Sequence, residues 1–277
     1  MQLGIFAKTF VGTSPQQVLS AAADAGYATV QYNMACSGLD AMPDVISDDQ
    51  TKAIAQATQN TKISIAAVSG TYNMIHPDLR IRAKGMARLE TLGASCSVMG
   101  TGMITLCTGT CDADDQWRHH PDNSSDASWA DLLGEMEKAI AIAERYDLAL
   151  GIEPELANVV SSAAKANTLI YTLKSSRLRV ILDAANLFKV ASLVEQHDVI
   201  DEAVDLLVES LAMAHAKDRS ATGAFVAAGK GVLDYGYYIS ALKRCGFQGP
   251  IIAHGLTAAE APHVALFLND MLQQVGN

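Results

Sequence analysis

The chain has 277 residues, 49% of them hydrophobic, and a formal net charge of -10 from 20 Lys+Arg and 30 Asp+Glu. An acidic surface repels phosphate backbones, so this charge argues against nucleic acid as a partner. The sequence shows no signal-peptide pattern, no apolar run of the ~18 residues that span a membrane, and no CxxC pair among its five cysteines. We therefore expect a cytoplasmic protein with no membrane partner, no disulfide framework and no thiolate zinc site.

Short apolar runs that are typical of buried strands recur along the chain, and helical patterns separate them. Several runs are apolar on both faces, as strands buried in a parallel sheet are. The eight predicted strands are residues 3–7, 28–33, 63–70, 103–109, 148–155, 179–186, 211–218 and 251–255. They are the framework for every prediction that follows.

The helical patterns fill the gaps between these runs. The first has Ser14 as its predicted N-cap, a proline in its first turn and Gly26 at its end. The other seven are predicted within residues 47–60, 78–94, 126–147, 161–176, 193–210, 234–246 and 258–275. Eight strand–helix units and the chain length predict an eightfold (β/α) TIM barrel, with residues 1–277 as a single domain. The alternative, a doubly wound open sheet, lacks its glycine-rich phosphate loop after the first strand.

One predicted connection, residues 108–129, is far longer than a usual loop between a strand and a helix. Long loops with their own polar and aromatic groups are usually lids or binding loops. The alternative is an Ω-like surface loop. We predict substrate contacts from Trp117, Arg118, His120 and Asn123 in this connection.

The ends of the last four predicted strands carry two carboxylates and two imidazoles. Active sites of such barrels gather at the C-terminal ends of the strands, where Glu153, Asp183, His215 and His254 stand. Each residue alone has a structural interpretation, because a strand-end aspartate often caps a helix and a single histidine is more often structural. Together they indicate a metal site, since ionisable groups this deep need partners or a metal. The mixed ligands suit a divalent ion, Mn, Zn, Co, Fe or Mg, better than an all-oxygen calcium cage.

Three further side chains are predicted beside this cluster. Glu155 lies two residues past Glu153, so it either points into the same barrel mouth or pairs with a basic neighbour. In the barrel mouth it is predicted to bind the substrate, and it is a candidate for the proton transfer beside Glu153 and His254. Lys217 shares a strand face with His215 under period-two alternation and is predicted to reach the substrate. Lys230 is predicted to contact a phosphate or carboxylate, and its alternative is a solvated lysine.

These strand ends resemble those of the sugar phosphate isomerase/epimerase family, the xylose isomerase-like barrels. "GIEPE" resembles the family's fifth-strand segment, "VILDAAN" its sixth and "HAKD" its seventh. The segment "AAGKGVLDYGYYISALKRCGFQGPI" resembles its glycine-rich stretch, helix and final strand, so the resemblance covers most of the chain. It implies that Glu153, Asp183 and His215 are metal ligands.

Two positions depart from the family pattern. Asn186 stands where the family commonly has a histidine, and we predict that it contacts the substrate. His254 stands where the family commonly has a glutamate that is both ligand and acid/base. Family epimerases exchange protons through two glutamates on opposite faces of the substrate, and this chain keeps only Glu153 of that pair. A symmetric two-glutamate mechanism is therefore not expected.

The predicted function is that of a divalent-metal-dependent sugar or sugar-phosphate isomerase or epimerase. It would transfer a proton next to a metal-polarised carbonyl of a small carbohydrate, with Glu153, His254 and Lys217 as catalytic residues. One alternative is a lyase or dehydratase, resembling inosose dehydratases, with the same enediolate chemistry. Another is a non-catalytic sugar-binding barrel, which the histidine at position 254 suggests. The resemblance also favours a homodimer or homotetramer.

Overall fold

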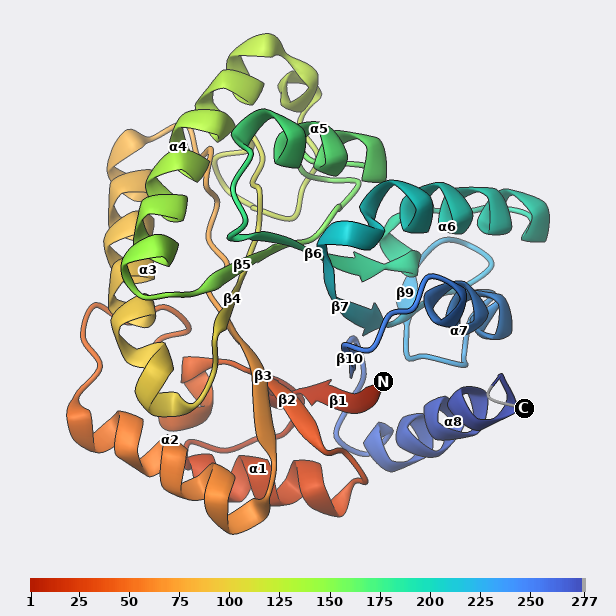
Figure 1. Cartoon of the computed structure of the whole chain (residues 1–277), viewed down its shortest axis with the longest axis horizontal. Helices are drawn as coiled ribbons and strands as arrows, with labels where there is room; N and C mark the ends of the chain where they lie inside the picture. Colours follow the sequence, from red (N-terminus) through yellow and green to blue (C-terminus); the bar gives the residue numbers. More distant parts are fainter. Residues whose placement is uncertain (276–277) are drawn as a thin grey trace.

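The centre of the molecule is a closed barrel of eight parallel strands (Figure 1). The computed structural model describes residues 1–275. Strands pair in sequence order around the barrel, and the last barrel strand closes it by pairing with the first, with Leu3 opposite Ile251. This closure confirms the eightfold barrel and excludes an open sheet.

Every predicted strand and helix is present, and the predicted strand runs mostly extend past the strands themselves. The barrel strands are β1 (Gln2–Phe6), β2 (Thr29–Tyr32), β3 (Ser64–Ser69), β4 (Met103–Leu106), β5 (Ala149–Ile152), β6 (Leu178–Asp183), β7 (Leu211–Ala216) and β10 (Pro250–Ala253). Two strands outside the barrel, β8 (Asp218–Arg219) and β9 (Phe225–Val226), form a hairpin that the sequence did not predict.

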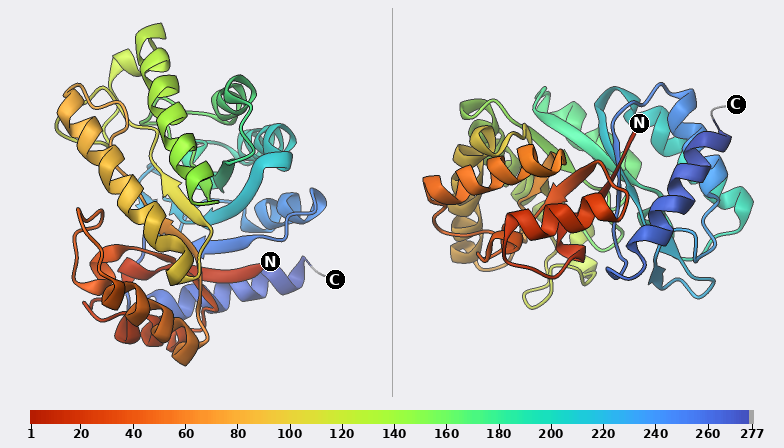
Figure 2. Two further views of the ribbon diagram at one scale, coloured as in Figure 1. Left: turned by 60° about the vertical axis from the view of Figure 1, so that its left-hand side comes forward. Right: turned by 90° about the horizontal axis from the view of Figure 1, so that it is seen from below.

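The helices surround the barrel, and α8 from the end of the chain lies beside β1 from its start (Figure 2). They are α1 (Pro15–Asp24), α2 (Asp48–Thr61), α3 (Leu79–Met99), α4 (Asp126–Arg145), α5 (Ala163–Leu173), α6 (Leu193–Leu207), α7 (Tyr235–Arg244) and α8 (Ala261–Gln274). Short 3-10 helices are η1 (Ala7–Thr9), η2 (Met34–Ser37), η3 (Pro121–Ser124), η4 (Ala184–Asn186) and η5 (Val208–Ser210). Ser14 occupies the N-cap position of α1, as predicted, although its side chain makes no capping hydrogen bond. None of the helices within residues 1–275 combines the length and apolar composition that a membrane crossing requires.

The barrel interior has an apolar floor and a polar mouth. The floor is a buried cluster of inward side chains, Ala67, Met103, Ile181, Met213 and Ile252. Gly151 makes room in it, because a Cβ at this position would lie only 2.9 Å from Ile181 Cδ1. Since side chains alternate along a strand, the next inward positions lie two residues further toward the C-terminal ends. Glu153, Asp183 and His215 occupy such positions directly above the floor.

The hairpin is organised by the buried carboxylate of Asp218. Its two oxygens accept hydrogen bonds from four backbone N–H groups, those of Arg219, Gly229, Gly231 and Leu233, at 2.8–3.1 Å. The chain from residue 218 to 233 therefore folds around one side chain. This fold fixes the position of Phe225, which lies opposite Arg219 in the hairpin.

Candidate metal centre and active site

Four side chains converge at the C-terminal mouth of the barrel. Glu153 follows β5, Asp183 ends β6, His215 lies in β7 and His254 follows β10. One ligand atom from each of them lies within 4.8 Å of the others. The structure thus brings together all four residues that the sequence predicted as ligands, and the cluster can hold a metal ion.

His215 is oriented by a hydrogen bond on the ring nitrogen that faces away from Glu153. Its Nε2 lies 2.8 Å from Gln31 Oε1, while the amide nitrogen of Gln31 donates to Ser69 and Thr105. The oxygen of Gln31 therefore accepts from Nε2–H, which leaves a lone pair on Nδ1. Histidines that bind metals are commonly held in this way.

The Nδ1 atom of His215 provides the test of whether the site fits a cation. It is buried without a hydrogen-bond partner, and Glu153 Oε2 lies only 3.2 Å away. A lone pair that faced this carboxylate directly would be unfavourable, so a proton or a cation is needed between the two atoms. A divalent cation among these ligands would satisfy both atoms, so the donor set fits a metal.

Asp183 and His254 are held in the protonation states that metal binding requires. Burial opposes ionisation of Asp183, but Lys217 Nζ at 3.4 Å and His254 Nε2 at 3.0 Å outweigh it and hold the pKa of this carboxyl well below its usual range. Burial and the neighbouring His215 lower the pKa of His254, although Asp183 opposes this. A metal binds a carboxylate in its deprotonated form and an imidazole in its neutral form. The lowered pKa values of Asp183 and His254 favour these forms.

Glu153 is ionised despite its burial. Burial raises its pKa, but His215 and Lys217 together lower it by a larger amount, so the net pKa lies below the ordinary value. Its second oxygen, Oε1, accepts a hydrogen bond of 2.7 Å from Asn186 Nδ2. The sequence assigned Asn186 to the substrate, whereas the structure gives it the role of orienting a predicted metal ligand.

Glu155 and Lys217 form a second polar layer above the four ligands. Lys217 Nζ lies 4.0 Å from Glu155 Oε2 and 4.0 Å from the ring centroid of Phe225. Burial raises the pKa of Glu155 to about 7, although the ammonium of Lys217 pulls it down. The structure thus places a carboxyl group that titrates near neutrality beside the four-ligand cluster.

A cavity of about 400 Å³ opens above the cluster. Glu153, His215 and His254 line its floor, and Glu155, Trp117 and Phe225 are among the side chains of its walls. This volume lies within the range of about 300–1,000 Å³ that is typical of small-molecule sites. The cavity is therefore large enough for a small substrate that reaches the four ligands.

Five predicted substrate contacts lie outside the cavity lining, namely Asn186 and the four residues Arg118, His120, Asn123 and Lys230. Arg118 pairs with Asp112 at 2.6 Å, and Lys230 pairs with Glu260 at 2.6 Å. His120 and Asn123 are bound within the loop. His120 Nδ1 accepts a hydrogen bond from Asp122 N–H, and Asn123 bridges Cys111 N–H and the Ala157 carbonyl. These polar groups stabilise the loop, whereas Trp117 of the same loop lines the cavity.

The sequence analysis did not assign several residues that belong to the site. Gln31, Ser69 and Thr105 form the hydrogen-bonded support of His215, and each stands near the end of a predicted strand. That position was the signal that could have identified them. Phe225 gave no such signal, because it reaches the cavity from a hairpin outside the barrel.

Removal of the amide of Asn186 should weaken metal binding without unfolding the protein. In Asn186→Ala the carboxylate of Glu153 loses its 2.7 Å hydrogen bond, and loss of such a supporting contact typically costs about 10- to 100-fold in metal affinity. Competition with a fluorescent chelator would measure the affinity, with the exposed Asn269→Ala as the control. Unchanged affinity in Asn186→Ala would show that the amide does not support the site.

The chain belongs to the xylose isomerase-like TIM barrel family, whose model matches residues 19–267. Similar solved structures include an L-ribulose 3-epimerase (TM-score 0.77, 13% identity, 99% of this chain and 95% of that chain covered). The IolI protein with a bound zinc atom has a TM-score of 0.74 and 17% identity, with 99% of each chain covered. A 3-keto-D-glucoside 4-epimerase, YcjR from E. coli, has a TM-score of 0.74 and 15% identity, with 100% of this chain and 99% of that chain covered. No curated protein matched the sequence, and at these identities the structures support the fold alone.

Proposed function

We propose that this protein is a divalent-metal-dependent sugar isomerase or epimerase. The observation that carries the proposal is the convergence of Glu153, Asp183, His215 and His254 within 4.8 Å beneath a substrate-sized cavity. A bound divalent ion would supply polarisation of a substrate carbonyl and of the neighbouring hydroxyl. Similar structures that are epimerases, and one that carries zinc, support the same conclusion.

Other residues at the cavity position the metal ligands and set the charge around them. Asn186 and Gln31 hold Glu153 and His215 in place, so the ligand set is preorganised. Lys217 lies 3.4 Å from Asp183 Oδ2 and 4.0 Å from Glu155 Oε2, so its ammonium lowers the pKa of both carboxyl groups.

Glu155 is the cavity carboxylate that lies outside the four-ligand set, and its nearest ionic partner within residues 1–275 is Lys217 at 4.0 Å. We assign the proton transfer to this side chain, which is one of the two roles that the sequence analysis predicted for it.

A lyase reaction at the same site is the second candidate. His254 Nε2 lies 3.0 Å from Asp183 Oδ2, so this imidazole is engaged by a neighbouring ligand. Proton transfer from one side of the substrate then suits elimination of a β-hydroxyl group as well as isomerisation. The masses of the products distinguish the two reactions, because elimination loses water and isomerisation leaves the mass unchanged.

Solvent isotope exchange tests the proposed function. Protein loaded with Mn²⁺, Zn²⁺, Co²⁺, Fe²⁺ or Mg²⁺ would be incubated in D₂O with a panel of ketoses, keto-glycosides and sugar phosphates. We expect deuterium to enter the carbon beside the carbonyl of at least one compound, and a chelator to abolish the exchange. Glu155→Gln should slow the exchange by about 10²- to 10⁴-fold, whereas Glu137→Gln, exposed on α4, should not. Metal-loaded protein that exchanges none of these compounds would argue for a non-catalytic barrel.

A further inference from the structure

Two large aromatic side chains from separate loops line the wall of the cavity. Trp117 comes from the connection between β4 and α4, and Phe225 comes from the β8–β9 hairpin. Trp117 is 54% exposed and Phe225 is 46% exposed. Apolar area of this kind is stabilised when a ligand covers it, and an aromatic ring adds a specific stacking face.

Phe225 is fixed in position before any ligand binds. The Arg219 guanidinium carbon lies 3.6 Å from the centroid of its ring, and Lys217 Nζ lies 4.0 Å from it. Arg219 is itself buried and donates 2.7 Å hydrogen bonds to the carbonyls of Ala185 and Gly223. The ring therefore rests on a rigid support that connects the hairpin to the end of β6.

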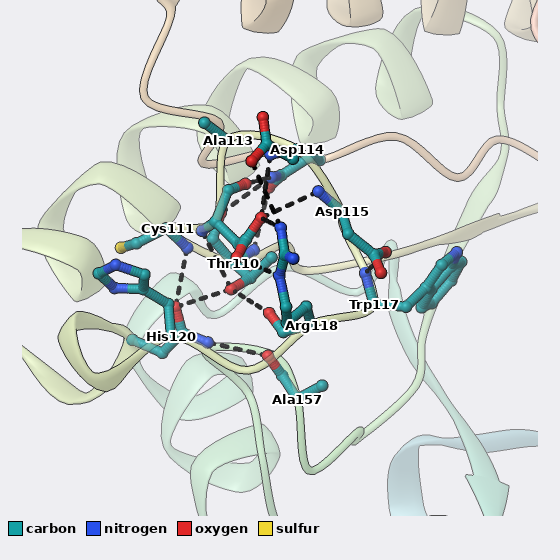
Figure 3. Close-up of polar contacts among 12 residues, drawn as sticks. Thr110, Cys111, Ala113, Asp114, Asp115, Trp117, Arg118, His120 and Ala157 are labelled. Carbon is teal, nitrogen blue, oxygen red and sulfur yellow. Dashed lines mark hydrogen bonds and ion pairs between the residues drawn. The ribbon is translucent and has the colours of Figure 1, made fainter.

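Trp117 is fixed by the backbone on both sides of it. Its own N–H donates to Asp115 Oδ1 at 2.9 Å, and the next residue, Arg118, is clamped by Asp112. Figure 3 shows these contacts gathered on one side of the loop, with the indole pointing away from them. Because the backbone that carries the indole is already ordered, less conformational entropy is lost when the ring binds, and more of its contact energy contributes to affinity.

Within residues 1–275, the cavity lining provides no basic side chain that is free to bind a phosphate. Among residues 1–275, Lys217 is the basic side chain of the lining, and Asp183, Glu155 and Phe225 already surround its ammonium. Arg118, Lys230 and Arg219 are occupied by the contacts described above. A phosphoryl group would lose its hydration, meet the carboxylates of Glu153 and Glu155, and gain no new cationic partner from the chain.

We propose that the substrate is an uncharged sugar derivative that carries both a carbonyl group and an apolar substituent, such as an aryl or alkyl glycoside with a ketone on its sugar ring, rather than a sugar phosphate. This inference rests on the proposed function, because it assumes that the sugar lies over Glu153 and His215. The apolar substituent then covers Trp117 and Phe225. The two rings and the absence of a cationic pocket in residues 1–275 are the determinants of specificity.

Tryptophan fluorescence tests the substrate class directly. The chain has two tryptophans, so Trp129→Phe leaves Trp117 as the single reporter in the cavity wall. Metal-loaded protein would be titrated with D-glucose, phenyl β-D-glucopyranoside and D-glucose 6-phosphate, and with the corresponding galactose series. We expect a phenyl glycoside to bind at least about 10-fold more tightly than its parent sugar, and the phosphate to bind no more tightly than the parent.

Phe225→Ala in the same background should remove most of this 10-fold preference. Tyr171→Ala removes an exposed aromatic ring of α5 and should leave the preference unchanged. Tightest binding of a sugar phosphate, equal binding of the phenyl and parent sugars, or no response to either phenyl glycoside would each overturn the proposed substrate class. Phenyl glycoside binding without exchange of any compound in D₂O would support the substrate class and contradict the isomerase function. The experiments can therefore contradict the substrate class and the isomerase function independently of each other.

Discussion

Asp183→Asn should lose its tightly bound metal and at least about 10³-fold of its proton-exchange rate. Asp183 is completely buried, and its Oδ2 faces both His254 and Lys217. The amide is neutral and is a weaker ligand, so the site loses one negative charge beside the cation. The electrostatic contribution of a catalytic metal amounts to several kcal/mol, and each 1.36 kcal/mol corresponds to about a factor of ten in rate.

The Asp183→Asn variant should still fold. Asp183 Oδ1 accepts a 2.9 Å hydrogen bond from Ala185 N–H, and the amide oxygen can accept the same bond. Metal content after dialysis, the exchange rate in D₂O and the melting temperature would be measured together. Asp205→Asn, exposed on α6, is the matched control. A variant that retains full metal occupancy and rate would remove Asp183 from the metal site.

The four-ligand cluster was predictable because it follows from the barrel and from strand alternation. Once eight strands are placed, the C-terminal ends of β5, β6, β7 and β10 must meet at one mouth. Period-two alternation then aims residues 153, 183 and 215 inward, and His254 follows in the same way. The sequence therefore contained both the position and the chemical type of these side chains.

The loops were less predictable, because a sequence shows which polar groups are present and not which partners they choose. Arg118 was assigned to the substrate, but Asp112 lies six residues before it and accepts two of its side-chain hydrogen bonds, while Asp114 accepts a third. Lys230 was likewise assigned to an anion and is paired with Glu260. Phe225 depends on a hairpin only two residues wide on each side, which is too short to give a periodic pattern. These contacts depend on the folded loop and not on strand spacing.

Asp218→Ala should destabilise the protein by roughly 3 kcal/mol and lower its melting temperature by about 6–12 °C. The alanine leaves four backbone N–H groups without their acceptor. Each buried donor without a partner costs about 1–3 kcal/mol. Water that binds the more exposed of these N–H groups recovers part of this cost. The loss should also release the hairpin that carries Phe225, so the preference for phenyl glycosides should fall with stability. Differential scanning calorimetry measures the first effect and fluorescence titration measures the second.

Two further variants separate the role of this carboxylate from a general effect of mutation. Asp198→Ala removes an exposed aspartate of α6 and should melt within about 1 °C of the parent protein, because it breaks no buried contact. Gly231→Ala keeps the carboxylate but places a Cβ against Asp218 Oδ1 and the Arg219 carbonyl, so it should be destabilised as well. If Asp218→Ala melted like Asp198→Ala, the hairpin would have to be held by other contacts. The support of Phe225 would then come from Lys217 and from Arg219, which is held by its bonds to Ala185 and Gly223.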